Sequence, residues 1–188
     1  LHVLREPRQQ VPTAIRMQRL ASPEHDRDLD LRALAEKALD VPRPDGLPKL
    51  SIYRVLKDMP WHQHGARNLG AFVAFGDWLL LSDMDHMLKL DAVCKLFERL
   101  DNGGLDPRTV YMPSRIEADT GLPTMQNGHL KPHPNSFVMT HEMYWYIGGY
   151  DEDYTGVYGT DSLFRHRAFN RARRGRLDDV PLTRYWSD

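Results

Sequence analysis

The apolar residues of this chain fall into short continuous runs and into stripes at helical spacing, separated by polar segments rich in Gly and Pro. Residues 78–82 form an apolar run of the kind found in a strand that is covered on both faces. Residues 26–39 and 90–100 carry apolar side chains every three or four positions, which indicates helices. A third helix is predicted at 65–75, where small residues would allow close approach to a sheet.

The other predicted elements continue this order. Further strands are predicted at 13–20, 50–56, 109–113 and Phe137–Thr140, and further helices at His141–Ile147 and 160–173. Residues 117–135 are rich in Gly, Pro, Asn and His, which predicts a long loop over a site. Because strands and helices alternate through at least the first 100 residues, we predict an α/β fold with a mostly parallel central sheet flanked by helices.

Length and charge narrow the class of protein. A chain of 188 residues with 41% hydrophobic residues can bury one core, so we expect a single domain. Its 25 basic and 26 acidic residues leave a formal charge of −1, so we expect no nucleic-acid partner. The longest apolar runs, 71–75 and 78–81, are far too short to span a bilayer.

Cysteine content and the start of the chain bear on the compartment. Cys94 is the only cysteine, which excludes an internal disulfide and is compatible with a reducing cytoplasm. Its place in the apolar stripe 90–100 predicts a buried side chain. The chain begins at Leu1 with neither a Met nor a basic-then-apolar leader, so we expect no signal peptide and a trimmed start. We therefore expect a cytoplasmic domain, which would meet a membrane only through partners.

Two acids directly follow the apolar strand at 78–82. Asp83 and Asp85 lie past its carboxyl end, where open α/β sheets place their ligands. Alternation turns positions i and i+2 to the same side, so both carboxylates are expected to face one cation. One or two carboxylates completed by substrate phosphates are the usual way to hold Mg²⁺ or Mn²⁺. The alternative is that both acids simply solvate the end of the strand.

A second group of polar residues lies between Gly148 and Arg167. Asp161 follows a Tyr-Gly-Thr segment and opens a helix, so it either caps that helix or acts as a general base beside an acceptor. His86 and His166 are the histidines nearest to the two groups of acids, and either is a candidate third metal ligand.

Aromatic and basic residues complete the set of candidates. Trp61 and Trp145 lie near the proposed site in the sequence, and sugar rings stack well on aromatic faces, although core packing would explain Trp145 equally well. A basic run, interpreted as a solvated helix end that complements the helix dipole, consists of Arg171, Arg173, Arg174 and Arg176.

These residues fall into two ordered motifs. The first is His-Gly-Ala-Arg-Asn-Leu-Gly at 64–70, which leads to Asp-Met-Asp at 83–85. The second is Gly-Gly-Tyr-Asp-Glu at 148–152, followed by Gly-Thr-Asp at 159–161 and a downstream Arg. The first resembles the centre of GT-A-fold glycosyltransferases of the large family 2 type. The second is similar to the carboxyl-terminal signature of the same enzymes and of galactosyltransferase-like domains, and the match covers about residues 50–170.

The resemblance implies a GT-A fold and a metal-assisted transfer of a sugar from a nucleotide-diphosphate sugar to an acceptor hydroxyl. Asp85 would ligate the metal, Mn²⁺ or Mg²⁺, and Asp83 would face the ribose and the metal. Asp161 would be the general base of an inverting reaction, although related retaining enzymes share the sheet and the metal motif. Arg67 and Asn68 would lie near the donor or brace the sheet. The acceptor side would include Trp145, Gly148, Gly149, Asp151 and Glu152.

The resemblance also implies a division of labour along the chain. Residues 1–66 would be a reduced nucleotide-binding part, and residues 67–188 would hold the metal, acceptor and catalytic groups. The acceptor class stays open between a glycan, a lipid, a protein and a small molecule.

Three features of the family are missing from the sequence. The apolar first strand is not found, because residues 1–10 are a poor substitute, so the fold is expected to lack that strand. The acidic pair that follows the second strand is replaced by Leu-Ala-Ser-Pro at 20–23, and Thr160 stands where a Glu precedes the base. Two alternatives therefore remain: a GT-A-like binding or structural module with impaired catalysis, and a metal-dependent nucleotidyltransferase or phosphohydrolase.

Overall fold

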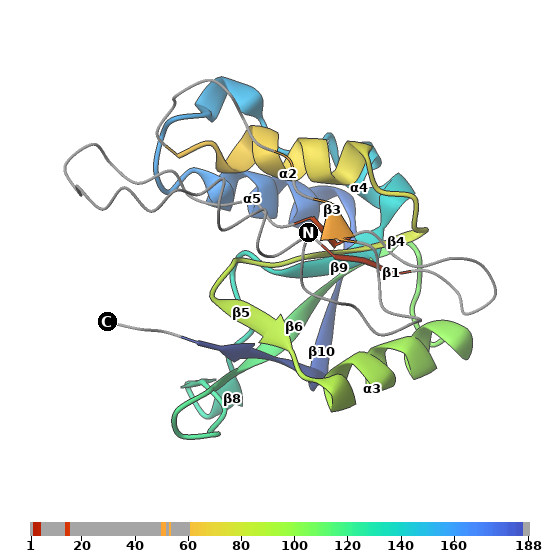
Figure 1. The fold of residues 1–188 in the computed structure, drawn as a ribbon, viewed down its shortest axis with the longest axis vertical. Coiled ribbons are helices and arrows are strands. Elements are labelled where there is room, and N and C mark those ends of the chain that lie inside the picture. Colours follow the sequence, from red (N-terminus) through yellow and green to blue (C-terminus); the bar gives the residue numbers. More distant parts are fainter. Residues whose placement is uncertain (1, 5–13, 16–49, 52, 54–60, 186–188) are drawn as a thin grey trace.

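A computed structural model describes residues 2–4, 14–15, 50–51, 53 and 61–185 of the chain (Figure 1). The helix predicted at 26–39 lies outside the described residues, as do most positions of the two strands predicted before residue 60. The parts of those strands that are described, β2 (Ala14–Ile15) and β3 (Leu50–Ser51), pair with each other in parallel.

Six strands form the central sheet, in the spatial order β1-β4-β9-β6-β10-β5. Their bounds are β1 (His2–Leu4), β4 (Trp78–Leu81), β9 (Phe137–Thr140), β6 (Thr109–Glu117), β10 (Arg173–Arg184) and β5 (His86–Leu88). The pair β6–β10 is parallel, whereas β1–β4, β4–β9, β9–β6 and β10–β5 are antiparallel. Consequently β4, β6 and β10 run in one direction, and their carboxyl ends share one edge of the sheet.

The α/β class is confirmed, but strand directions in this sheet are more mixed than the predicted, mostly parallel arrangement. The prediction extended the strand–helix alternation of the first 100 residues to the whole chain. Between β6 and β9, however, the chain returns through a loop without a helix, which delivers the next strand antiparallel. The first strand of the family was expected to be missing, and most residues that this expectation concerns lie outside the described ranges. Among the described residues, β1 pairs with β4 and forms one edge of the sheet.

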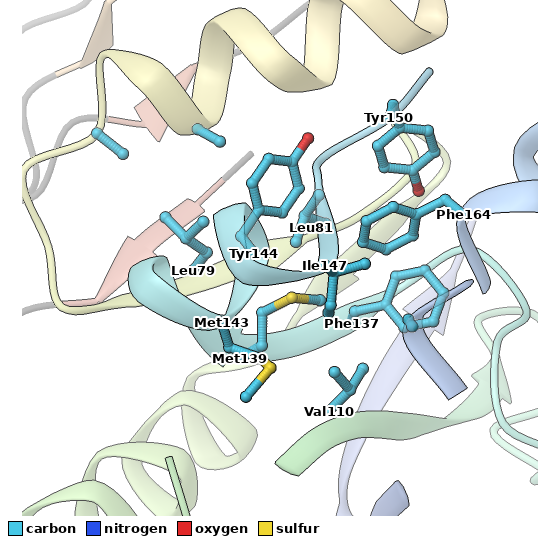
Figure 2. Packing of buried hydrophobic residues seen from close by; sticks show 13 residues of the cluster. Leu79, Leu81, Val110, Phe137, Met139, Met143, Tyr144, Ile147, Tyr150 and Phe164 are labelled. Carbon is cyan, nitrogen blue, oxygen red and sulfur yellow. The ribbon is translucent and has the colours of Figure 1, made fainter. Parts of the chain in front are cut away.

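Helices cover both faces of the sheet (Figure 1). One face packs against α2 (Gln63–Phe72), α4 (His141–Ile147) and α5 (Asp161–Arg171), and the other against α3 (Leu90–Asp101). Alternation along β4 sends Leu79 and Leu81 to the first face and Leu80 to the second. Figure 2 shows the first core, in which Phe137 of β9 and Phe164 of α5 make an edge-to-face contact at 5.5 Å.

The predicted helices and strands after residue 60 are confirmed within a few positions, with four differences. One is β5, which no sequence pattern predicted. The predicted loop at 117–135 contains a short hairpin of β7 (Met125–Gln126) and β8 (His129–Leu130), and a 3₁₀ turn, η1, spans Glu152–Tyr154. Most of the basic run begins β10, because the last helix ends at Arg171. None of the described helices is long and apolar enough to cross a membrane.

The predicted burial of Cys94 is wrong, because its side chain is exposed. The buried positions of α3 are Ala92 and Leu96, which lie one turn apart on the face that packs against the sheet. Cys94 lies midway between them, and an offset of two residues places a helical side chain near the opposite face.

Candidate functional site

The acids of the first motif lie at the sheet edge where β4, β6 and β10 end. Asp83 and Asp85 follow β4 within a short turn that leads into β5. Their side chains are 27% and 33% exposed, so both are open to a ligand but partly enclosed by neighbours. This edge is the one at which ligands meet parallel strands in α/β folds.

Arg67, from the second turn of α2, joins this edge to the second motif. Its buried guanidinium forms an ion pair with Asp83 and donates hydrogen bonds to the Tyr150 hydroxyl (2.8 Å) and the Asn135 carbonyl (2.7 Å). Burial alone would lower the pKa of Arg67, but Tyr150 and Asp83 outweigh that cost and raise it. Arg67 therefore stays charged and fixes the acid of one motif relative to the tyrosine of the other.

Asn68 forms a second connection between the motifs. Its amide nitrogen donates to the Tyr150 carbonyl (2.8 Å) and to Glu152 (2.7 Å). Its amide oxygen accepts from the Tyr150 backbone (2.8 Å) and from the Tyr144 hydroxyl (2.7 Å). Gly149 has a φ of +60°, and a Cβ there would lie 2.8 Å from that amide oxygen. The second glycine of the motif therefore leaves room for Asn68.

His64, one turn earlier on α2, holds the chain that follows Tyr150. Its Nδ1 lies 2.7 Å from the Asp151 carbonyl and so donates to it, while its Nε2 lies 3.2 Å from the Thr160 hydroxyl. A single imidazole thus contacts both ends of the segment 151–160, which leads into α5.

Asp161 is the first residue of α5 and is half-buried. Within the described part of the chain its carboxylate has no hydrogen-bond or ion-pair partner, and its charge helps to raise the pKa values of Arg67 and Tyr150. Burial is the main cause that raises the pKa of Tyr150 to about 12. Asp161 thus lies close enough to the Arg67–Tyr150 pair for its charge to act on both groups.

Two histidine rings pack against each other beside the Asp-x-Asp turn, tilted by 43°. The rings of His86 and His133 are 4.0 Å apart, and both side chains are buried. His86 Nδ1 lies 2.7 Å from Asp85 Oδ1, and His133 Nδ1 lies 2.7 Å from the Ser136 hydroxyl. Burial, followed by His86 and nearby arginines, lowers the pKa of His133 to about 2. The imidazole of His133 is therefore neutral, with its Nε2 facing Asp83 Oδ2 at 3.7 Å.

The ends of β6 and β10 add a charged cluster next to these histidines. Glu117 pairs with Arg184 (2.7 Å), lies 3.8 Å from Arg115, and accepts a hydrogen bond from the Thr124 hydroxyl (2.6 Å). The bond from Thr124 is the largest cause that lowers the pKa of Glu117, and the two arginines add to it. Burial and the like charge of Arg184 lower the pKa of Arg115.

Several predicted site residues have local structural contacts. Gly148 ends α4 in the left-handed conformation with a φ of +97°, and Asp151 accepts the capping hydrogen bond of η1. Trp145 is 40% exposed, and its Nε1 lies 3.1 Å from His141, which contacts the Ala71 carbonyl and thereby braces α4 against α2. These contacts are compatible with a position next to a substrate but do not require one.

The histidines that sequence reasoning considered do not all gather at the acids. His86 lies beside Asp85, whereas His166 is exposed on α5. His133 Nε2 lies 3.7 Å from Asp83 Oδ2, but as one of two histidines in a predicted loop it gave no signal that singled it out. An open pocket of about 310 Å³, lined by residues including Phe75, lies at the opposite end of β4 from the acids.

The carboxylate oxygens at this edge suit a divalent cation whose coordination shell is completed by a substrate. Among the described residues, no group of three or more His, Cys, Asp or Glu side chains is arranged to hold a metal ion. Asp83 uses one carboxylate oxygen for Arg67, and Asp85 uses one for His86, so each retains an oxygen. A cation held by one or two carboxylates and by substrate phosphates needs no closed protein cage.

The order of the strands, the covering helices and the position of the Asp-x-Asp turn define the GT-A fold of nucleotide-diphospho-sugar transferases. Similar solved structures include TarS 1-349 of S. aureus (16% identity, TM-score 0.59, 84% of this chain and 48% of that one). GalNAc-T7 with UDP, GalNAc and Mn²⁺ is 12% identical, with a TM-score of 0.58 over 94% of this chain and 37% of that one.

The mannosyltransferase PcManGT from Pyrobaculum calidifontis, in complex with GDP-Man and Mn²⁺, is 16% identical. Its TM-score is 0.53 over 99% of this chain and 60% of that chain. This chain therefore spans less than two thirds of each of the three structures. No protein-family model and no curated protein sequence matches the chain. The similarity to the three structures establishes the fold alone.

Proposed function

We propose that this chain is the catalytic part of a glycosyltransferase that moves a sugar from a nucleotide-diphosphate sugar to an acceptor hydroxyl. The observation that carries the proposal is the connection of the two motifs through one helix of the GT-A fold. Arg67 links Asp83 to Tyr150, and Asn68 links Tyr150 to Glu152. Arg67 pairs with Asp83 and is also stabilised by the charge of Asp161, so acids of both motifs act on one guanidinium, which a binding module would not need.

The donor side of the proposed site consists of Asp83 and Asp85. Their free oxygens would hold Mn²⁺ or Mg²⁺ against the donor diphosphate, and the similar structures that contain Mn²⁺ support this choice of metals. The metal would neutralise charge that develops on the departing diphosphate. Arg67 stays charged because of its interactions with Asp83 and Tyr150, and it would keep Asp83 in place when a ligand binds.

On the acceptor side, Asp161 would accept the proton of the attacking hydroxyl in an inverting reaction. Its carboxylate lies at the N-terminus of α5 and has no hydrogen-bond or ion-pair partner among the described residues, which suits a general base. The aromatic pair Trp61 and Tyr158, with ring centroids 4.4 Å apart, borders the same segment. Tyr158 is 76% exposed, so its ring face is open to a sugar of the acceptor.

The test is turnover of a panel of nucleotide sugars with Mn²⁺, using a mixture of glycan, lipid and small-molecule acceptors. We expect transfer from at least one donor, lost on chelation. Asp161→Asn should reduce the rate by about 10²–10⁴. The matched control is Asp153→Asn, an exposed acid in the same segment, which should leave the rate unchanged. Equal activity of the two variants would contradict the role of Asp161, and nucleotide transfer or phosphate release instead of sugar transfer would contradict the function.

A further inference from the structure

The spacing between His133 and Asp83 does not fit a direct interaction between them. His133 Nε2 and Asp83 Oδ2 are 3.7 Å apart, which is beyond the usual range of a hydrogen bond. Two neighbouring ligands of one divalent cation, each about 2.1 Å from it, are about 3.0–3.6 Å apart at ligand angles of 90–120°. The two atoms therefore have nearly the separation of two donors that share one cation.

The ring of His133 is held in an orientation that presents Nε2 to this gap. Its Nδ1 is bonded to the Ser136 hydroxyl at 2.7 Å, and its ring packs against that of His86 at 4.0 Å with a tilt of 43°. A hydrogen bond to the second ring nitrogen is the usual device that orients a metal-binding imidazole.

A second, independent observation comes from the neighbouring histidine, whose ring lies 4.0 Å from that of His133. His86 is buried, and its Nε2 has no hydrogen-bond partner among the described residues. Its Nδ1 is bonded to Asp85 Oδ1. A buried polar atom without a partner is costly, so His86 leaves one unsatisfied ring nitrogen next to His133 and Asp85.

The surrounding charges decide how strongly a cation would bind alone. Asp83 and Asp85 lie beside the pair of histidines, and Arg67, Arg115 and Arg184 act on His133. Glu117 pairs with Arg184 and lies 3.8 Å from Arg115. The three positive charges offset the three negative ones, so a bare cation gains little net attraction. A diphosphate adds the negative charge that is lacking, and we therefore expect cation and diphosphate to bind together.

We propose that His133 is a protein ligand of the divalent cation, paired with Asp83, and that the site consequently prefers Mn²⁺ to Mg²⁺. Imidazole nitrogen is a good ligand for transition metals, whereas Mg²⁺ prefers oxygen. The inference rests on the proposed function only in placing a cation–diphosphate complex at this sheet edge. It names a ligand that comes from the loop before β9 rather than from either motif.

The direct test measures free Mn²⁺ by electron paramagnetic resonance while the protein is titrated with Mn²⁺ in the presence of inorganic pyrophosphate. Pyrophosphate carries the diphosphate without base or sugar, so the result does not depend on the identity of the donor. We expect His133→Gln to weaken Mn²⁺ binding at least tenfold and to leave Mg²⁺ competition nearly unchanged. The matched control, His129→Gln, removes an exposed histidine from the same loop and should bind as the unaltered protein does.

A second measurement needs no variant and so covers the case in which His133→Gln fails to fold. In the ¹⁵N spectrum of the histidine rings, substoichiometric Mn²⁺ with pyrophosphate should broaden the Nε2 signal of His133 before that of His129. Broadening of neither signal, or equal Mn²⁺ affinity of both variants, would overturn the proposal. If the protein gives one of these results but still transfers sugar, only the role of His133 is contradicted. If Mn²⁺ binds His133 but no sugar is transferred, only the proposed function is contradicted.

Discussion

Removal of Arg67 tests whether the connection between the two motifs is energetically important. Arg67→Met keeps an unbranched apolar stem but removes the ion pair with Asp83 and the hydrogen bonds to Tyr150 and the Asn135 carbonyl. Breaking a buried ion pair by removing one partner costs about 3–5 kcal/mol. We expect about 3 kcal/mol, the lower end, because the Asp83 side chain is 27% exposed and water solvates part of the freed charge.

The assay is urea unfolding followed by tryptophan fluorescence. With a slope of about 2 kcal/mol per molar urea, a loss of about 3 kcal/mol shifts the midpoint down by about 1.5 M. Asp83→Asn removes the unpaired charge, so the double variant Arg67→Met with Asp83→Asn should recover about 1–2 kcal/mol relative to additivity. A loss below about 1 kcal/mol for Arg67→Met, or strictly additive effects, would refute the reasoning.

Three further measurements follow from the described contacts. Gly149→Ala should destabilise the protein by about 2–3 kcal/mol in thermal unfolding, because its positive φ and a side-chain oxygen 2.8 Å from the new Cβ both oppose the substitution. The control, Gly159→Ala, has a positive φ but open space around the new Cβ, so it should cost only about 1 kcal/mol. Equal losses for the two variants would contradict crowding at Gly149. The hydrogen bond from Thr124 lowers the pKa of Glu117 in the folded state, so the stabilisation is present above the ordinary glutamate pKa and is lost as the pH falls through the folded value. The unfolding free energy of Glu117→Gln should therefore depend less steeply on pH below about 4.5 than that of the unaltered protein, and parallel curves would exclude this contribution. Cys94 should react with a thiol reagent in the native protein at the rate of a free thiol, and protection until unfolding would contradict its exposure.

Much of the fold after residue 60 follows from local patterns. The apolar run of β4 and the helical stripe of α3 are both strong signals, and both elements are present within one residue of their predicted bounds. The strand β10 gave no such signal, because Arg173, Arg174 and Arg176 occupy its first half and acids interrupt its second. Its burial depends on pairing with β6, a contact between segments distant in sequence that no local pattern records.

The candidate site was predictable where a residue type at a fixed spacing carries the chemistry. Asp83 and Asp85 lie two positions apart directly after β4, so their shared position at the strand end could be inferred from the sequence alone. The partners of Arg67 and the contact of His133 with Asp83 could not, because each joins residues from separate elements. Tertiary packing alone decides which of nine histidines reaches the acids.

The contacts of His64 have a consequence for how this protein could diversify. One imidazole ring meets both the Asp151 carbonyl and the Thr160 hydroxyl, so the two ends of the intervening chain lie close together. Compact surface loops with adjacent ends vary in length and sequence at little cost to the framework that carries them. The segment between Asp151 and Thr160 is thus expected to tolerate replacement. A different segment would change the residues next to Asp161, while Tyr150 and the sheet edge would keep their positions.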